Sequence, residues 1–132
     1  FQYVLGEVEF YGVMLNIDQR ALIPRPETEE LVDWIVNTVN HKNSSIKYDD
    51  LRMLDICSGS GCIAFGLKSS FKKNEIIAGE LSKDALSLIS ENCIKTELDI
   101  NILELDALNL DTFSKIKEHS LDVLMEYLKP PQ

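Results

Sequence analysis

Three acidic residues occupy positions suited to binding a positively charged ligand. Asp55 lies in a short apolar segment four residues before Gly59, Glu80 ends a second apolar segment about 20 residues further on, and Asp106 ends a third. A carboxylate beside a Gly-rich turn repels a pyrophosphate but attracts an ammonium or sulfonium group. An acid at the second position accepts hydrogen bonds from the hydroxyls of a ribose. The three acids therefore favour S-adenosylmethionine over a nicotinamide dinucleotide.

The turn after the first apolar segment is rich in glycine and serine. Gly59 and Gly61 permit positive φ and a close approach of the backbone to a ligand, and the helix that follows offers unpaired N–H groups. The looser nicotinamide pattern Gly-x-Gly-x-x-Ala also fits residues 59–64, so only the acids separate the two ligands. The alternative for each acid taken singly is an ordinary polar residue at a strand end. The predicted cofactor-binding residues are Asp55, Cys57, Ser58, Gly59, Ser60, Gly61, Glu80, Leu81, Asp106 and Ala107.

The elements that must position these residues alternate between strands and helices. Apolar runs predict strands at 52–57, 75–79, 100–105 and 121–125, and helical spacing predicts helices at 62–71, 82–98 and 112–118. This alternation predicts an α/β fold with a parallel sheet, right-handed crossovers and helices on both faces. Before it, residues 8–17 predict a β-hairpin, and a helix is expected to begin at Pro26 and run to about His41.

The expected organisation is a hairpin and linker over 1–22 and a cofactor-binding domain over 23–132. Four predicted strands are fewer than a doubly wound sheet usually has, so only the N-terminal part of that domain is expected. The strand at 121–125 is then an apolar edge, which predicts self-association.

Composition narrows the function classes. The chain has 132 residues with 22 acidic and 13 basic side chains, a formal net charge of -9, which disfavours nucleic acid as the main partner and favours a basic protein or a small ligand. Three cysteines without a Cys-x-x-Cys pattern, and no histidine beside them, predict neither a metal site nor a disulfide framework. These cysteines are read as reduced thiols, which favours a cytoplasmic location. No apolar run approaches the roughly 18 residues of a membrane span, so no membrane partner is expected.

Three segments of the chain resemble the HemK/PrmC family, the protein-(glutamine-N5) methyltransferases that act on peptide-chain release factors. The matching segments are Gln2 to Gly12, Leu22 to Glu29 with its Pro-Arg-Pro-Glu-Thr core, and Leu54 to Ala64. The resemblance implies a Rossmann-like methyltransferase fold, S-adenosylmethionine as cofactor, and N5-methylation of a release-factor glutamine. It also implies that Arg25, Pro26, Glu27 and Thr28 wall the substrate or cofactor pocket.

The chain departs from the family at both ends. The family has a helical domain before the first matching segment and Asn-Pro-Pro-Tyr after the fourth strand, where this chain has Lys129-Pro130-Pro131-Gln132. The sequence therefore assigns no catalytic residue, and the chain is expected to be truncated and to transfer little methyl by itself. Two other functions stay open: a non-catalytic or truncated S-adenosylmethionine-binding module, and an adenine-N6 methyltransferase of nucleic acid. The net charge and the Pro-Arg-Pro-Glu-Thr block count against the latter.

Overall fold

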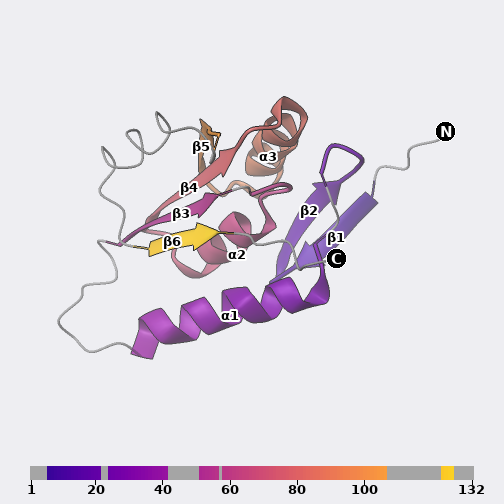
Figure 1. Ribbon diagram of the computed structural model, residues 1–132. Coiled ribbons are helices and arrows are strands. Elements are labelled where there is room, and N and C mark those ends of the chain that lie inside the picture. Colours follow the sequence, from indigo (N-terminus) through magenta and orange to yellow (C-terminus); the bar gives the residue numbers. More distant parts are fainter. Residues whose placement is uncertain (1–5, 22–23, 42–50, 57, 107–122, 127–132) are drawn as a thin grey trace, which may run out of the picture.

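The computed structural model describes residues 6–21, 24–41, 51–56, 58–106 and 123–126. An antiparallel hairpin comes first, followed by alternating helices and strands (Figure 1). In chain order the elements are β1 (Gly6–Phe10), β2 (Val13–Ile17), α1 (Pro26–His41), β3 (Arg52–Ile56), α2 (Cys62–Ser70), β4 (Glu75–Glu80), α3 (Lys83–Thr96), β5 (Asn101–Glu104) and β6 (Val123–Glu126).

The second sheet has the order β5-β4-β3-β6, and each neighbouring pair is parallel. The chain builds outward from β3 through β4 to β5 and then crosses back to place β6 on the other side of β3. The order of the strands therefore reverses between β3 and β6. In open parallel sheets ligands bind outside the carboxyl ends of the strands at such a reversal.

The predicted elements are confirmed with boundaries that shift by a few residues. The hairpin and the helix from Pro26 to His41 form as expected, and α3 begins after Ser82, whose hydroxyl accepts a hydrogen bond from the backbone N–H of Ala85 at 3.3 Å. This contact satisfies one of the free N–H groups of the first helical turn. The strand β4 extends to Glu80, whereas β5 is shorter than predicted and ends at Glu104. The predicted helix at 112–118 lies outside the described residues.

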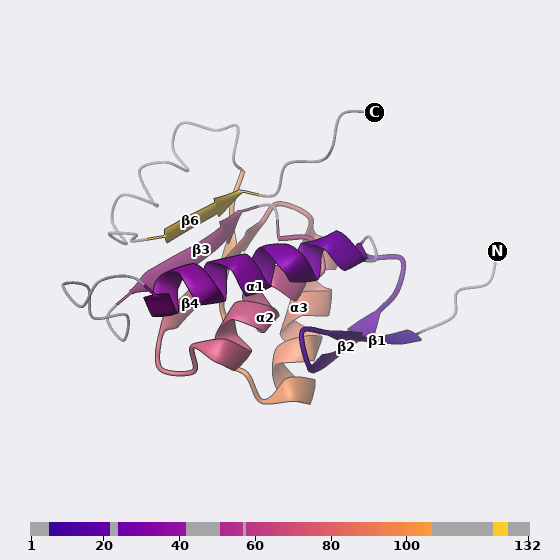
Figure 2. The same cartoon turned by 90° about the horizontal axis from the view of Figure 1, so that it is seen from below.

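One layer of helices covers one face of this sheet. Side chains of α1, α2, α3 and the hairpin pack with Met53, Ile76 and Ala78 in the main core, and Figure 2 shows the three helices on the same side of the strands. On the opposite face Leu54, Ile56, Ile77 and Leu105 form a smaller buried cluster. No helix among the described residues packs on that second face, and the helix predicted at 112–118 lies outside the described ranges.

The hairpin is attached to α3 by polar contacts as well as by its core residues. Asn92, fully buried, accepts a hydrogen bond from the backbone N–H of Asn16 at 2.7 Å and donates one to its carbonyl at 3.0 Å. Because both polar groups of this buried amide are paired, the hydrogen bonds offset the cost of burying it, and it fixes the hairpin edge against the helix. The predicted division of the chain at residue 22 stays a prediction.

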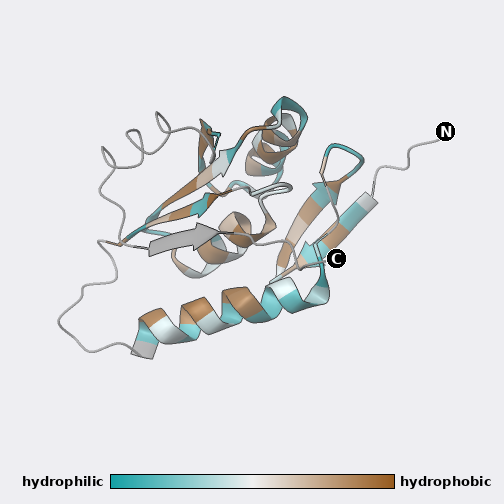
Figure 3. Ribbon diagram, viewed as in Figure 1, coloured by the Kyte–Doolittle hydropathy of each residue, from teal (hydrophilic) through white to brown (hydrophobic). Residues whose placement is uncertain are grey.

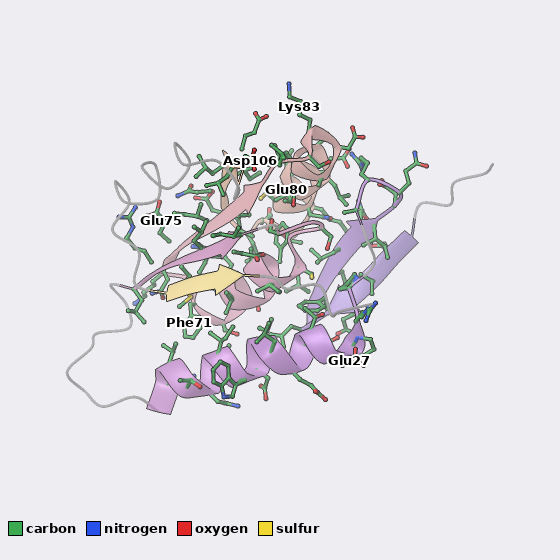
Figure 4. The ribbon with its side chains drawn as sticks, in the orientation of Figure 1. Glu27, Phe71, Glu75, Glu80, Lys83 and Asp106 are labelled. Atoms are coloured by element: carbon green, nitrogen blue, oxygen red, sulfur yellow. The ribbon has the colours of Figure 1, made fainter. Side chains whose placement is uncertain are left out.

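An ion pair joins the amino-terminal ends of β3 and β4. Arg52 Nε donates to Glu75 Oε1 at 2.6 Å, and Asn101 also hydrogen-bonds to Glu75. Figure 4 shows Glu75 at one end of β4 and Glu80 at the other. In the described part of the chain, no helix has the length and apolar character needed to cross a membrane.

Candidate cofactor-binding site

The Gly/Ser turn after β3 is built by backbone geometry that only glycine adopts easily. Gly59 has φ +59° and Gly61 φ +79°, both in the left-handed region. Ser58 N–H donates to the carbonyl of Gly79 at 3.1 Å, which ties the turn to β4, and Gly61 N–H donates to Ser58 O at 2.8 Å. A Cβ at Gly61 would lie 3.1 Å from the side chain of Ile89, whereas one at Gly59 would meet nothing within 4 Å. The turn is therefore packed at Gly61 and open at Gly59.

Glu80 connects this turn to the start of α3. Its Oε1 accepts the backbone N–H of Gly59 at 2.8 Å and its Oε2 accepts that of Ser82 at 2.8 Å. An ionised carboxylate has about four lone-pair sites, so each oxygen keeps capacity for one more donor. Glu80 is partly exposed, and this arrangement suits it to accept the two hydroxyls of a ribose.

Asp55 lies one strand away from Glu80 and has different surroundings. It has no exposed surface, and neither of its carboxylate oxygens has a hydrogen-bond partner. Burial raises the pKa of Asp55 to about 8; the backbone N–H of Ala64 opposes the rise without forming a hydrogen bond, and the charge of Glu80 adds to it. In Figure 3 the end of β3 is hydrophilic within a largely hydrophobic sheet. Buried oxygens without donors fit a ligand that brings its own, such as an ammonium group.

Two smaller side chains of the turn complete its buried part. The hydroxyl of Ser58 is buried without a hydrogen-bond partner, like the Asp55 carboxylate. Ser60 is also buried, and its side chain contacts the thiol of Cys62. Burial raises the pKa of Cys62 to about 12, so this thiol stays protonated and does not act as a nucleophile.

The end of β5 brings a third acid beside Glu80. The backbone N–H of Leu105 donates to the carbonyl of Glu80 at 3.0 Å, and Asp106, which is partly buried, follows directly. Figure 4 shows Asp106 and Glu80 at the same end of the sheet. Leu81 is 56% exposed and offers an apolar surface next to Glu80. Cys57 and Ala107, also predicted at this site, lie outside the described residues.

The structure thus brings Asp55, Ser58, Gly59 and Glu80 together but not the Pro-Arg-Pro-Glu-Thr block. Arg25, Pro26 and Glu27 are exposed and Thr28 is buried at the start of α1, where Thr28 N–H donates to Arg25 O at 3.0 Å. Figure 4 shows Glu27 well apart from Glu80. The predicted pocket wall at residues 25–28 stays a prediction. Among the described residues no cluster of His, Cys, Asp and Glu side chains could hold a metal ion.

Sequence reasoning missed two backbone groups that shape the site. The N–H of Ser82 holds one oxygen of Glu80, and the N–H of Ala64 faces the Asp55 carboxylate. A signal was present for the first, because Ser82 is recognisable as a helix cap two residues after a strand-end acid. The second depends on how the first turn of α2 sits over β3, for which spacing along the chain gives no sign.

The fold is that of S-adenosylmethionine-dependent methyltransferases, as predicted. The structure of a SAM-dependent methyltransferase from Agrobacterium tumefaciens matches with a TM-score of 0.71 at 17% identity, covering 92% of this chain and 39% of that one. The N-terminal domain of human METTL16, solved in complex with SAH, matches with a TM-score of 0.68 at 24% identity, covering 92% of this chain and 47% of that one. At these identities the likeness concerns the fold alone.

Sequence relatives are more specific than the structural neighbours. A release factor glutamine methyltransferase of Lactococcus lactis is 39% identical over 130 residues, 98% of this chain and 43% of the relative. The one of Flavobacterium psychrophilum is 40% identical over 114 residues, 86% of this chain and 39% of the relative. The human MTRF1L release factor glutamine methyltransferase is 32% identical over 133 residues, 98% of this chain and 39% of the relative.

The predicted resemblance to release factor glutamine methyltransferases is confirmed by these relatives. The chain spans about two fifths of the length of the relatives it matches. No protein-family model matches it.

Proposed function

We propose that this chain is the S-adenosylmethionine-binding part of a methyltransferase that N5-methylates a glutamine side chain of a peptide chain release factor. The observation that supports the cofactor is the presence of two different acids at one edge of the sheet. Asp55 is buried without a hydrogen-bond partner, and Glu80 is held in place by two backbone N–H groups. The similarity to proteins named release factor glutamine methyltransferase supports the substrate.

The described residues suit the different parts of such a cofactor. Asp55 and the hydroxyl of Ser58 provide buried acceptors for an ammonium group, and Glu80 provides acceptors for ribose hydroxyls. Leu81 provides an apolar surface for a base, and Asp106 a carboxylate for its amino group. The open side of the turn at Gly59 lets the ligand approach the backbone closely.

In such a methyl transfer the main task of the protein is to orient the substrate amide toward the methyl group. When bound, S-adenosylmethionine would supply a methyl group carried on a positively charged sulfur; the glutamine amide nitrogen would gain this methyl and lose a proton, leaving S-adenosylhomocysteine. An amide nitrogen is a poor nucleophile, so the substrate must be held in line and hydrogen-bonded where charge develops. The negative charge of Glu80 favours the cationic cofactor over its neutral-sulfur product before transfer. The ammonium group of a bound ligand would favour the ionised form of Asp55. The buried Cys62, protonated at neutral pH, takes no part.

The charge of the site also argues against dinucleotides and nucleic acid. A pyrophosphate at the turn would meet the negative charge of Glu80 and the buried acceptor oxygens of Asp55, and a net charge of -9 repels a phosphate backbone. The adenine-N6 alternative would need a local basic surface to overcome this repulsion.

Calorimetric titration tests the cofactor, with S-adenosylmethionine, S-adenosylhomocysteine, NAD and ATP as ligands. We expect the first two to bind and the last two not to bind; tighter binding of NAD than of S-adenosylmethionine would refute the assignment. The substrate is tested by incubation with methyl-labelled S-adenosylmethionine and either a release factor or adenine-containing DNA. Label recovered on a release-factor glutamine supports the proposal, and label recovered on adenine supports the alternative.

A further inference from the structure

A shallow groove lies between the hairpin turn and the outward side of α1, apart from the cofactor-binding site. It encloses about 410 Å³, and its lining residues are Tyr11, Glu29, Glu30, Asp33, Trp34 and Asn37. Figure 1 shows α1 running below the sheet with its first turn near the hairpin. Glu80 ends β4, and Figure 4 shows it well apart from Glu27 in the first turn of α1. The proposed function uses none of these residues.

An exposed tryptophan forms the apolar part of the groove. Trp34 is 64% exposed and is the single tryptophan of the chain. Its neighbours along the inner side of α1, Val32 and Ile35, are buried in the core, so Trp34 contributes little to the packing of the helix. An exposed indole presents a negative π-face that attracts cations, and guanidinium groups most often.

The polar part of the groove is acidic and partly fixed in place. Asp33 accepts a hydrogen bond from the hydroxyl of Tyr11 at 3.0 Å and another from the amide of Asn37 at 3.2 Å. These contacts fix the carboxylate in the groove that Trp34 also lines, while each oxygen keeps a free lone pair. Glu29 and Glu30 add two more carboxylates, and the sequence of α1 contains no lysine or arginine. No described lysine or arginine forms an ion pair with these three acids.

The arrangement fits an extended cationic segment better than a metal ion or a second copy of this chain. Within the described ranges no group of acidic side chains could hold a metal ion. A second copy carries the same charge of -9 and is repelled. Arginine matches both parts of the groove, because its planar guanidinium stacks on an aromatic face and donates in a fork to carboxylates.

We propose that this groove binds an arginine-bearing segment of a partner protein, with the guanidinium stacked on Trp34 and hydrogen-bonded to Asp33 and Glu30. The occupant is recognised by charge complementarity and by the stacking surface. None of the groove residues belongs to the proposed cofactor-binding site, so the proposal is tested separately from the proposed methyl transfer.

The fluorescence of Trp34 provides a direct readout, since no other tryptophan contributes. The 132-residue chain is titrated with a hexa-arginine peptide and, separately, with a hexa-lysine peptide of equal charge. We expect saturable binding of both and several-fold tighter binding of the arginine peptide. The double variant Glu30→Gln/Asp33→Asn should weaken the arginine peptide about tenfold, the scale of one to two lost charge-assisted contacts. Trp34→Leu, followed by calorimetry, should weaken it about threefold to tenfold and remove the preference for arginine.

A matched control separates a site from the general charge of the chain. Glu9→Gln/Asp99→Asn removes the same two charges at exposed positions outside the groove and should change the affinity less than about twofold. Equal weakening by both double variants, equal affinity for the two peptides, or the absence of saturable binding would each overturn the proposal. So would sedimentation showing that the peptide-free chain dimerises and loses this dimer in Trp34→Leu.

Discussion

The carboxyl-terminal ends of β3 and β4 each present one carboxylate, and the two have opposite surroundings. Asp55 has no exposed surface and no hydrogen-bond partner. Glu80 is partly exposed, and its two oxygens accept backbone N–H groups from the turn after β3 and from the start of α3. A carboxylate is therefore left without a hydrogen-bond partner at the end of β3, whereas the one at the end of the neighbouring β4 joins two backbone segments.

The difference indicates that Glu80 stabilises the structure of the site, whereas Asp55 is available to bind a ligand. Glu80 is used by the fold, because it joins two loops that would otherwise leave the N–H groups of Gly59 and Ser82 without an acceptor. Asp55 is not used by the fold, and burying it costs free energy that a cationic ligand would offset. The proposed cofactor-binding site thus contains one acid that stabilises the free protein and one that destabilises it.

The turn between the two strand ends offers the largest expected effect. Gly61→Ala must place a Cβ 3.1 Å from Ile89 and 3.2 Å from Phe65 at φ +79°. We expect it to lower the free energy of unfolding by about 2–4 kcal/mol, from left-handed strain plus overpacking. Gly59→Ala, at φ +59° with open space around its Cβ, carries only the strain, about 1–2 kcal/mol. Urea unfolding measures both, and equal losses would show that packing at Gly61 is not the cause.

Replacing Glu80 tests its role in stabilising the site. Glu80→Gln keeps the shape but offers a single acceptor oxygen, so the N–H of either Gly59 or Ser82 loses its partner. We expect a loss of about 1–3 kcal/mol in stability and a similar loss in affinity for S-adenosylmethionine. The control is Glu104→Gln, which is exposed and lies opposite Glu80 in the β4–β5 register; it should change stability by less than about 0.5 kcal/mol. An equal effect of the two substitutions would show that the hydrogen bonds of Glu80 do not stabilise the site.

Much of this fold could be predicted from the order of elements along the chain. Apolar runs and helical spacing located β3, α2, β4 and α3, and Ser82 marked the start of α3 because a serine cap leaves a local signal. The strand-end acids followed from the same pattern, since parallel strands end at one edge.

The different environments of the two acids could not be predicted in this way. Residues of β3 are buried on both faces, so no alternation tells which side Asp55 takes. Its lack of a partner depends on how α2 packs over β3, and the bond from Gly59 to Glu80 depends on the register that pairs Ile56 with Gly79. Both features depend on tertiary packing, whereas the spacing of residues along the sequence predicts only local structure.

Asp55 should make stability depend on pH with a characteristic sign. Burial raises the pKa of Asp55 to about 8 in the folded chain from 3.8, so the folded state holds a proton that the unfolded state releases. The contribution is fully present below about pH 4 and is lost as the pH rises through about 8. Relative to Asp55→Asn, which has no such proton, the wild-type chain should lose more than ~1 kcal/mol between pH 5 and pH 8. Urea unfolding of both at the two pH values measures this, and parallel pH profiles would show that Asp55 is ionised throughout.

The smallest expected effect concerns two buried serines of the same turn. Like the two acids, one has a partner and the other has none, but their hydroxyl groups are uncharged. The hydroxyl of Ser58 is buried without a partner, whereas that of Ser60 contacts the Cys62 thiol. Ser58→Ala removes an unsatisfied polar group, so it should leave the free chain unchanged or more stable by up to about 1 kcal/mol. Ser60→Ala gives up a contact and should cost about 0.5–1 kcal/mol.

Binding of S-adenosylmethionine separates the two serines again. If the free Ser58 hydroxyl serves the ligand as the Asp55 carboxylate does, Ser58→Ala binds it more weakly although the protein itself is not less stable. Thermal unfolding with and without ligand measures both quantities in one experiment, because a ligand that binds only the folded state raises stability by RT ln(1 + [L]/Kd). A loss of stability in Ser58→Ala without ligand would mean that the hydroxyl already has a partner in the free chain. The contrast would then be confined to the two acids.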